Sequence, residues 1–474
     1  MLTEEKPAEE RRAAEKAVAV SPEFSSELSE RMLIERMSGA RRQSDAIFSR
    51  VRPGSLYADS LYERPIPERH RIIFYVGHLE AFDWNLLSAV FGLNSAHSEF
   101  DRLFAFGIDP VGGGLPSDLP SDWPSVDVVR EYVRSVRSAI DRNLTKISAG
   151  PSPTRDGFPL RTLLNVAIEH RLMHAETLAY MLHQLPLNMK VVEPGAPILT
   201  GPPVNRSSVA IPASRVKLGL DRNSDTFGWD NEYEVHSVEV PAFEIDRYKV
   251  TNRQYLDFMA AGGYGTRAFW SDNDWDWKTA QEISHPLFWK KAASGWLWRA
   301  MFDEVPLPLD WPVYVSHAEA SAYARWAGKS LPTEAEWQLA AYGTAGGDAR
   351  PHSGGNKLPD FGYDAESSKE LGNLDFRRWD PVPVNAFPDG QSAFGVHDML
   401  GNGWEWTSTV FGPFPGFEPF PFYRGYSADF FDGKHFVMKG GSARTAACML
   451  RPSFRNWFQP HYQYVYAGFR CVSR

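Results

Sequence analysis

Residues 168–180 read IEHRLMHAETLAY, a stretch of helical character that carries two histidines four residues apart. Residues at positions i and i+4 lie one turn apart on the same helix face. His170 and His174 can therefore converge on one metal ion, as in other His-x-x-x-His sites. Glu176 lies about 200° round the helix from His174, at roughly 100° per residue, so a third ligand is expected from another segment. The alternative is that both histidines are ordinary surface or core residues.

The segments around this stretch predict a bundle of four helices over residues 25–190, preceded by a disordered or frayed tail over 1–24. The expected helices cover residues 24–51, 71–91, 125–147, and from 157 or 160 to 185. The core of such a bundle is a place where facing helices assemble a metal site. His78, in the second helix, is then the third ligand. A lone histidine on a buried helix is otherwise more often a satisfied core residue.

The character of the chain changes after Pro186, where short strand-like runs alternate with turn residues. We predict a linker over 191–208 and a second domain over 209–474. Within that domain the expected strands are 215–219 and 235–245, and the expected helices are 252–259 and 316–343, with a break at 328–332. Thr333 and Glu336 form a capping box for the part of the last helix beyond the break.

Composition restricts the classes of partner and compartment. The chain has 474 residues and a net charge of -9, so no broad basic surface favours nucleic acid as a partner. The charged N-terminus lacks the apolar region of a secretory signal, and no apolar run of 18 or more residues predicts a membrane span. Cys448 and Cys471 are the only cysteines, which excludes a disulfide framework. We therefore expect a cytoplasmic protein.

Six motifs in the second half are those of the formylglycine-generating enzymes, which this half resembles. They are WDNE at 229–232, FEIDRYKVTN at 243–252, WAGKSLPTEAEW at 326–337, GNGWEW at 401–406, GGS at 440–442 and AGFRC at 467–471. The resemblance implies a compact, C-type-lectin-like α+β domain. It does not extend to formylglycine synthesis, because those enzymes use a cysteine pair after the GGS motif and only Cys448 is present here.

A DinB-like helical bundle in front of such a domain resembles the non-haem iron(II) sulfoxide synthases of ergothioneine biosynthesis. In that family one ligand follows a glycine on an early helix, which is matched by His78, and two more are matched by His170 and His174. The resemblance implies iron(II), with O2 as co-substrate. It also implies formation of a C–S bond between a thiol and C2 of the imidazole of hercynine, which is trimethylated histidine.

The same resemblance assigns the residues that bind substrate. Arg455, Asn456 and Trp457 match the family's RNW motif, whose Asn and Trp contact hercynine. Trp457 can place an aromatic face against the quaternary ammonium as a cation–π contact, the alternative being a simple core residue. Tyr423 and Tyr426 lie where family members have a catalytic tyrosine that donates a proton or an electron.

Three departures from the family concern the sulfur donor and hercynine. Members that use γ-glutamylcysteine have an acid and an arginine where this chain has Phe458 and Tyr462, and residues 109–120 contain no arginine. We therefore expect free cysteine or another small thiol to be the donor. Met173 replaces a glutamine that contacts hercynine in some members, and Phe458 and Met173 complete the predicted substrate-binding residues. Other hypotheses are a synthase of the ovothiol type using histidine, one of the selenoneine type using a selenium donor, and a non-catalytic binding protein. Structural calcium in the second domain is left open.

Overall fold

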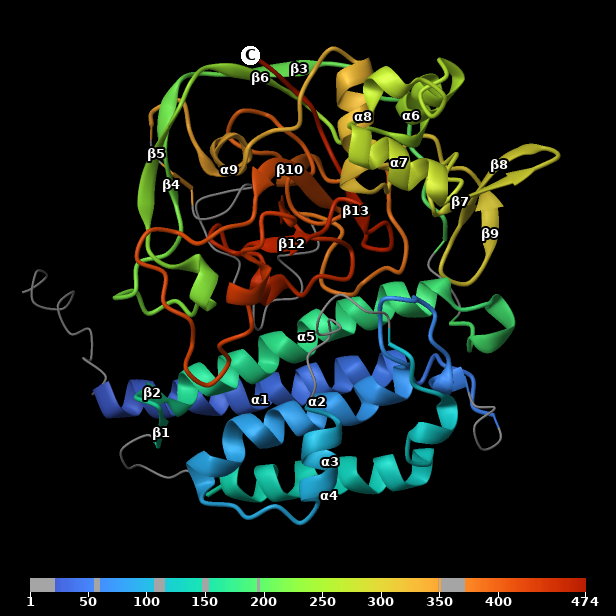
Figure 1. The fold of residues 1–474 in the computed structure, drawn as a ribbon. Helices are drawn as coiled ribbons and strands as arrows, with labels where there is room; N and C mark the ends of the chain where they lie inside the picture. The colour runs from blue at the N-terminus through green and yellow to red at the C-terminus, as the bar shows by residue number, and fades with distance from the viewer. Residues whose placement is uncertain are drawn as a thin grey trace, which may run out of the picture.

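The computed structural model describes residues 22–54, 60–105, 116–146, 153–193, 197–347, 349–350 and 371–474, with backbone alone over 22–29. Most of the predicted tail therefore lies outside the described residues. The chain forms a helical layer and, above it, an α+β layer, with α5 running between the two (Figure 1). Buried side chains of both layers belong to one continuous hydrophobic core.

The helical layer confirms the predicted bundle. Its long helices are α1 (Pro22–Phe48), α2 (Ile72–Leu87), α4 (Val126–Leu144) and α5 (Leu160–Gln184). Helix α5 packs against α1 and α2, and α2 packs against α4. Helix α4 buries one stripe at helical spacing, as expected for an amphipathic surface helix, whereas α2 and α5 are buried over most of their length. None of the helices in the described part of the chain is long and apolar enough to cross a membrane.

Two small elements of this layer were not predicted. A short helix, α3 (Ser98–Leu103), follows α2, and a hairpin of β1 (Thr154–Arg155) and β2 (Phe158–Pro159) precedes α5. The predicted helix over 71–91 ends as an α-helix at Leu87 and continues as a 3₁₀ turn over Ser88–Phe91.

The α+β layer has short sheets separated by loops, as the resemblance implied. Its strands are β3 (Ser208–Ile211), β4 (Ser214–Leu218), β5 (His236–Val240), β6 (Phe243–Asp246), β7 (Trp289–Ala292), β8 (Gly295–Arg299), β9 (Glu304–Pro306), β10 (Trp404–Val410), β11 (Phe436–Lys439), β12 (Asn456–Phe458), β13 (Ala467–Gly468) and β14 (Val472–Ser473). The central sheet has the order β12-β11-β10-β13, and β10 and β13 are parallel. Its edge strand β12 contains Asn456 and Trp457 and pairs with β11, Trp457 opposite Val437.

Helices α6 (Asn252–Ala260), α7 (Asp272–Ala280), α8 (His317–Trp326) and α9 (Glu334–Tyr342) complete this layer. The break predicted in 316–343 separates α8 from α9, and the Thr333–Glu336 capping box is present. The single strand predicted over 235–245 is wrong: it is divided into β5 and β6, which pair with different strands. Pro241 stands at the division, where a residue without an N–H cannot donate to a sheet.

Candidate metal centre and substrate pocket

The three predicted metal ligands lie together. Helix α2 contributes His78, and α5 contributes His170 and His174. One nitrogen from each ring can be chosen so that all three lie within 4.8 Å of one another. In the part of the chain that the structure describes, no other group of three or more His, Cys, Asp and Glu residues converges in this way. Structural calcium in the second domain, which the sequence leaves open, is not tested by this group.

The rings are oriented as ligands. Nδ1 of His78 lies 2.7 Å from the carbonyl oxygen of Phe104, directly after α3, so as a donor it leaves the Nε2 lone pair for a metal. Phe82 stacks on His170 with ring centroids 3.4 Å apart. Sequence reasoning missed α3 and Phe104, whose role depends on a carbonyl that any residue could supply.

Several ring nitrogens of the triad are buried without a hydrogen-bond partner: Nε2 of His78, both nitrogens of His170 and Nδ1 of His174. Buried polar atoms are normally paired, so this group of orphaned nitrogens is a donor set that fits a metal ion. Burial lowers the pKa of His78 to about 4 and those of His170 and His174 well below their usual value. The imidazoles are therefore neutral at physiological pH, which is the form that binds metals.

Both predicted tyrosines reach α5 from the loop after β10, and they differ in position. The Tyr423 ring lies 6.1 Å from that of His170 and 5.2 Å from that of Phe82. The Tyr426 hydroxyl donates to Sδ of Met173 at 3.4 Å, and its ring stacks on Trp229 at 4.0 Å. Tyr423 is thus beside a predicted metal ligand, whereas the Tyr426 hydroxyl bonds to Met173.

The three residues of the RNW motif lie in different surroundings. Trp457 stacks on Phe411 at 4.1 Å and meets Tyr426 edge-on at 5.5 Å, so the indole lies beside the tyrosines. Asn456 is half-buried, and its Oδ1 accepts from the Trp457 backbone N–H at 2.9 Å. Arg455 does not fit its predicted contact with substrate: it is buried, its Nε donates to Glu334 at 2.9 Å, and its guanidinium covers Phe411. It holds the ring on which Trp457 stacks.

A second face of α5, distinct from the one that carries His170 and His174, contacts the α+β layer. Residues at spacings of four and three face the α+β domain: Glu169, Met173, Glu176, Tyr180 and His183. Glu169 accepts from Trp229 Nε1 at 2.7 Å and Glu176 from Trp404 Nε1 at 2.8 Å. Glu176 also accepts from Thr445 at 2.7 Å. The helix therefore presents histidines to the triad and carboxylates to the other domain. The seven-residue spacing of the two glutamates places them on one helix face, and it was the sequence signal from which this contact with the other domain could have been predicted.

Behind the ligands lies a buried ion network. Arg171, next to His170, donates to Glu80 at 3.0 Å and to Asp83 at 2.7 Å, and all three side chains are 1% exposed. Arg137 of α4 also donates to Glu80 at 2.7 Å. Burial opposes ionisation of Glu80, but Arg171 and Arg137 hold its pKa at about 2. The network links α2 and α5, the two helices that carry the triad, through paired charges.

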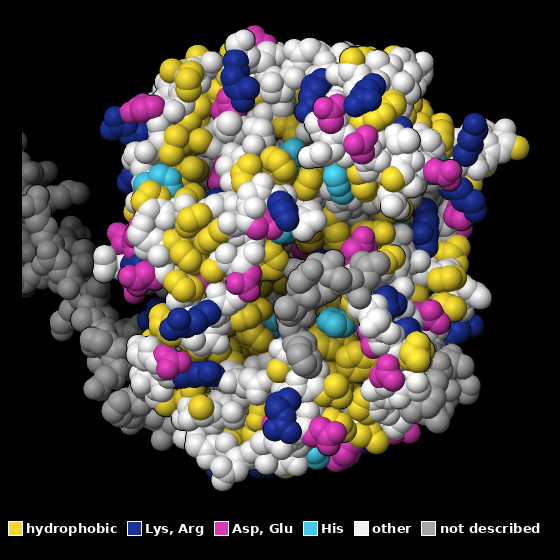
Figure 2. Space-filling model, in the orientation of Figure 1, with side chains coloured by type: hydrophobic (Ala, Val, Ile, Leu, Met, Phe, Trp, Pro, Cys, Tyr) yellow, Lys and Arg dark blue, Asp and Glu magenta, His cyan; other side chains and the backbone are white. Residues whose placement is uncertain are grey.

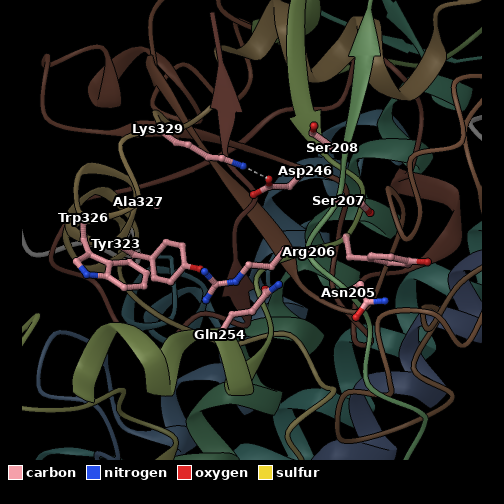
Figure 3. A pocket seen from close by; sticks show the side chains of 11 residues that line it. Asn205, Arg206, Ser207, Ser208, Asp246, Gln254, Tyr323, Trp326, Ala327 and Lys329 are labelled. Carbon is pink, nitrogen blue, oxygen red and sulfur yellow. Dashed lines mark hydrogen bonds and ion pairs between the residues drawn. The ribbon is translucent and has the colours of Figure 1, made fainter. Parts of the chain in front are cut away.

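The remaining predicted substrate residue, Phe458, stacks on Tyr462 with centroids 4.8 Å apart, and Arg69 lies over this pair. Figure 2 shows the surface hollowed along the seam between the layers, with hydrophobic side chains gathered there. A separate cavity of about 450 Å³ is lined by residues including Arg206, Asp246 and Lys329, and none of the predicted site residues lines it (Figure 3).

Comparison with known proteins agrees with this architecture. The sulfatase-modifying factor enzyme 1-like domain matches residues 200–474, and the DinB superfamily matches residues 40–178. The hercynine oxygenase of Mycobacterium tuberculosis is 37% identical over 360 residues, covering 72% of this chain and 77% of that protein. The chain belongs to the hercynine oxygenase family. Membership confirms the predicted fold class and the prediction that the protein is an enzyme, an oxygenase.

Two further similarities accompany this one. The hercynine oxygenase of Mycolicibacterium smegmatis is 38% identical over 387 residues, covering 79% of this chain and 83% of that protein. Among solved structures, PvdO from Pseudomonas aeruginosa has a TM-score of 0.37 and 20% identity, covering 56% of this chain and 93% of that one.

Proposed function

We propose that this hercynine oxygenase family member is an iron(II)- and O2-dependent sulfoxide synthase of ergothioneine biosynthesis. In this proposal it joins the sulfur of free cysteine to C2 of the hercynine imidazole. The observation that carries the proposal is the buried triad of neutral histidines, with orphaned ring nitrogens and Tyr423 beside it. Family membership supports hercynine as the acceptor.

His78, His170 and His174 would hold the metal. Three neutral imidazoles suit iron(II) and would leave coordination positions for small molecules. When bound, the iron supplies the capacity to activate dioxygen. The protein's contribution is to hold two substrates in near-attack geometry and to keep bulk water away from them. The burial of the triad at the junction of the two layers supports that role.

Asn456 and Trp457 would bind hercynine. The trimethylammonium group cannot donate a hydrogen bond, so an aromatic face is its natural partner. Phe411, backed by the Arg455 guanidinium, holds the Trp457 indole in one orientation beside the tyrosines. A preoriented ring binds the cation at a lower entropic cost than a mobile one.

Replacing Trp457 with alanine is expected to raise the KM for hercynine about 10-fold, since desolvated cation–π contacts contribute roughly 1–2 kcal/mol. The KM for cysteine should change less than about twofold. Steady-state oxygen uptake with each substrate varied in turn measures both. Trp457→Phe, which retains a ring, is the matched control and should bind hercynine better than Trp457→Ala. Equal increases for both substrates would show that Trp457 only supports the fold.

Tyr423 would act as the proton donor near the metal. Tyr423→Phe is expected to lower kcat about 100-fold, the typical contribution of a positioned acid, with little change in the KM for hercynine. Tyr426→Phe is the control, because that hydroxyl is already occupied by Met173, and should lower kcat less than about fivefold. Rates of sulfoxide formation, followed by mass spectrometry, test whether Tyr423→Phe loses more activity than Tyr426→Phe. A larger loss in Tyr426→Phe would transfer the role to Tyr426.

The function itself is tested by oxygen consumption of anaerobically iron-loaded protein given hercynine and cysteine, with product masses read afterwards. Hercynine-dependent uptake and a hercynyl-cysteine sulfoxide mass are expected. Parallel reactions contain γ-glutamylcysteine, histidine in place of hercynine, or a selenium donor. A faster reaction in one of these would replace the cysteine–hercynine assignment with that pair. No uptake with any pair, despite bound iron, would contradict the proposal and favour a binding role.

A further inference from the structure

We propose that Trp229 is a positioning residue for catalysis, whose indole fixes Tyr423 relative to the helix turn that carries His170. The inference rests on the proposed function, in which Tyr423 donates a proton. It goes further by assigning a role in the reaction to the WDNE motif at 229–232, whose sequence indicated only the fold.

Trp229 is fixed by a closed ring of four residues, which we call the Trp229 clamp: Glu169, Trp229, Glu232 and Arg451. Nε1 of the indole donates to Glu169 of α5 at 2.7 Å, and the Trp229 backbone N–H donates to Glu232 at 2.8 Å. Arg451 closes the ring, because it donates to Glu169 at 2.7 and 3.1 Å and to Glu232 at 2.8 Å. The indole is fully buried. A tryptophan held at its backbone and at its ring nitrogen in a packed interior has little freedom to turn.

The indole in turn supports the loop that carries both tyrosines. It stacks on the ring of Tyr426 with centroids 4.0 Å apart, and its centroid lies 6.4 Å from that of the Tyr423 ring. The two tyrosine rings are 5.5 Å apart. The next residue of the motif, Asp230, accepts a hydrogen bond from the Ser427 hydroxyl, at the end of the same loop. Two consecutive residues of one motif therefore hold the segment from 423 to 427.

The Trp229 clamp meets α5 at the residue before a proposed metal ligand. Glu169 directly precedes His170, whose ring centroid lies 6.1 Å from that of Tyr423. The helix turn with the proposed ligand and the loop with the proposed proton donor are thus tied to the same indole. A proton donor must lie within hydrogen-bond reach of its acceptor, and a displacement of about 1 Å can lower a rate about 100-fold. We therefore expect the orientation of the indole to affect kcat more than the affinity for hercynine.

The test removes the indole N–H and asks whether the loss of activity passes through Tyr423. Trp229→Phe keeps a ring against Tyr426 but cannot donate to Glu169, and it is expected to lower kcat about 10-fold while the KM for hercynine changes less than about threefold. In the Tyr423→Phe background the same substitution should lower kcat less than about twofold further, since the hydroxyl that it misplaces is already gone. A tenfold loss in both backgrounds, or a higher KM with unchanged kcat, would overturn the proposal.

Trp404→Phe is the matched control. Trp404 is buried, and its Nε1 donates to Glu176 of the same helix at 2.8 Å, but its ring lies beside that of Phe454, with centroids 6.1 Å apart. This variant loses an equivalent hydrogen bond, so its melting temperature should fall about as far as that of Trp229→Phe, whereas its kcat should change less than about twofold. Equal losses of kcat in the two variants would show that the indole of Trp229 contributes only to stability.

Two further measurements do not depend on the folding of Trp229→Phe or on turnover. Glu169→Gln keeps one oxygen for the indole N–H, and its smaller loss of kcat, about threefold, should likewise disappear in the Tyr423→Phe background. In crystal structures the Tyr423 and His170 rings, 6.1 Å apart here, should separate by about 1 Å or more in Trp229→Phe but not in Trp404→Phe. An unchanged separation would refute the role of the Trp229 clamp. Failure of the proposed function appears separately, as absence of hercynine-dependent oxygen uptake in wild type.

Discussion

Replacing His174 with alanine is expected to abolish iron binding and, with it, all hercynine-dependent oxygen uptake. Loss of one of three imidazoles leaves two ligands, His78 and His170, in a buried site that offers no other converging His, Cys, Asp or Glu among the described residues. Iron per chain, measured after anaerobic loading and desalting, should fall from about one to background. The same variant should still fold, because the orphaned nitrogens of the triad contribute no hydrogen bond to the protein.

His183→Gln is the control for this variant. His183 lies on the same helix and is buried, but its ring nitrogens lie within hydrogen-bond distance of the Tyr466 hydroxyl and the Arg299 carbonyl, away from the triad. Its iron content should equal that of wild type, even if its melting temperature is lower. Full iron loading in His174→Ala would refute the ligand assignment. Equal loss in both variants would show that iron binding only follows the stability of α5.

Arg171→Met should destabilise the protein by about 3–5 kcal/mol, the cost of breaking a buried ion pair and leaving its partner charged. Two carboxylates, those of Glu80 and Asp83, would lose an arginine that contacts both. Urea denaturation followed by circular dichroism measures the change as a lower midpoint, provided that the bundle and the second domain unfold in one transition. Glu80 keeps its contact with Arg137, so the variant is expected to fold.

The matched control is Arg134→Met on α4. Arg134 pairs with Glu131 three residues earlier, and both side chains are 65% exposed. Exposed pairs contribute little, so the free energy of unfolding should change by less than about 0.5 kcal/mol. A similar midpoint for the two variants would mean that the network around Arg171 is not a source of stability.

The sequence alone was sufficient to predict features that depend on local spacing. His170 and His174 share a face because they are one helical turn apart, whatever surrounds the helix. The Thr333–Glu336 capping box is likewise a three-residue relation, and it is present. The ordered motifs of the second half predicted the fold class and the family. The glycine before His78 allowed the third proposed ligand to be matched by resemblance.

The tertiary structure alone decided the contacts between distant segments. Arg69 and Tyr462 are separated by 393 positions, and no periodicity relates them. Arg455, in a motif predicted to contact substrate, is bound instead by Glu334, 121 positions earlier. The division of 235–245 into two strands also followed from which neighbours each half could pair with. Helical spacing is set by backbone geometry within a few residues, whereas the partner of a buried charge is set by how whole elements pack.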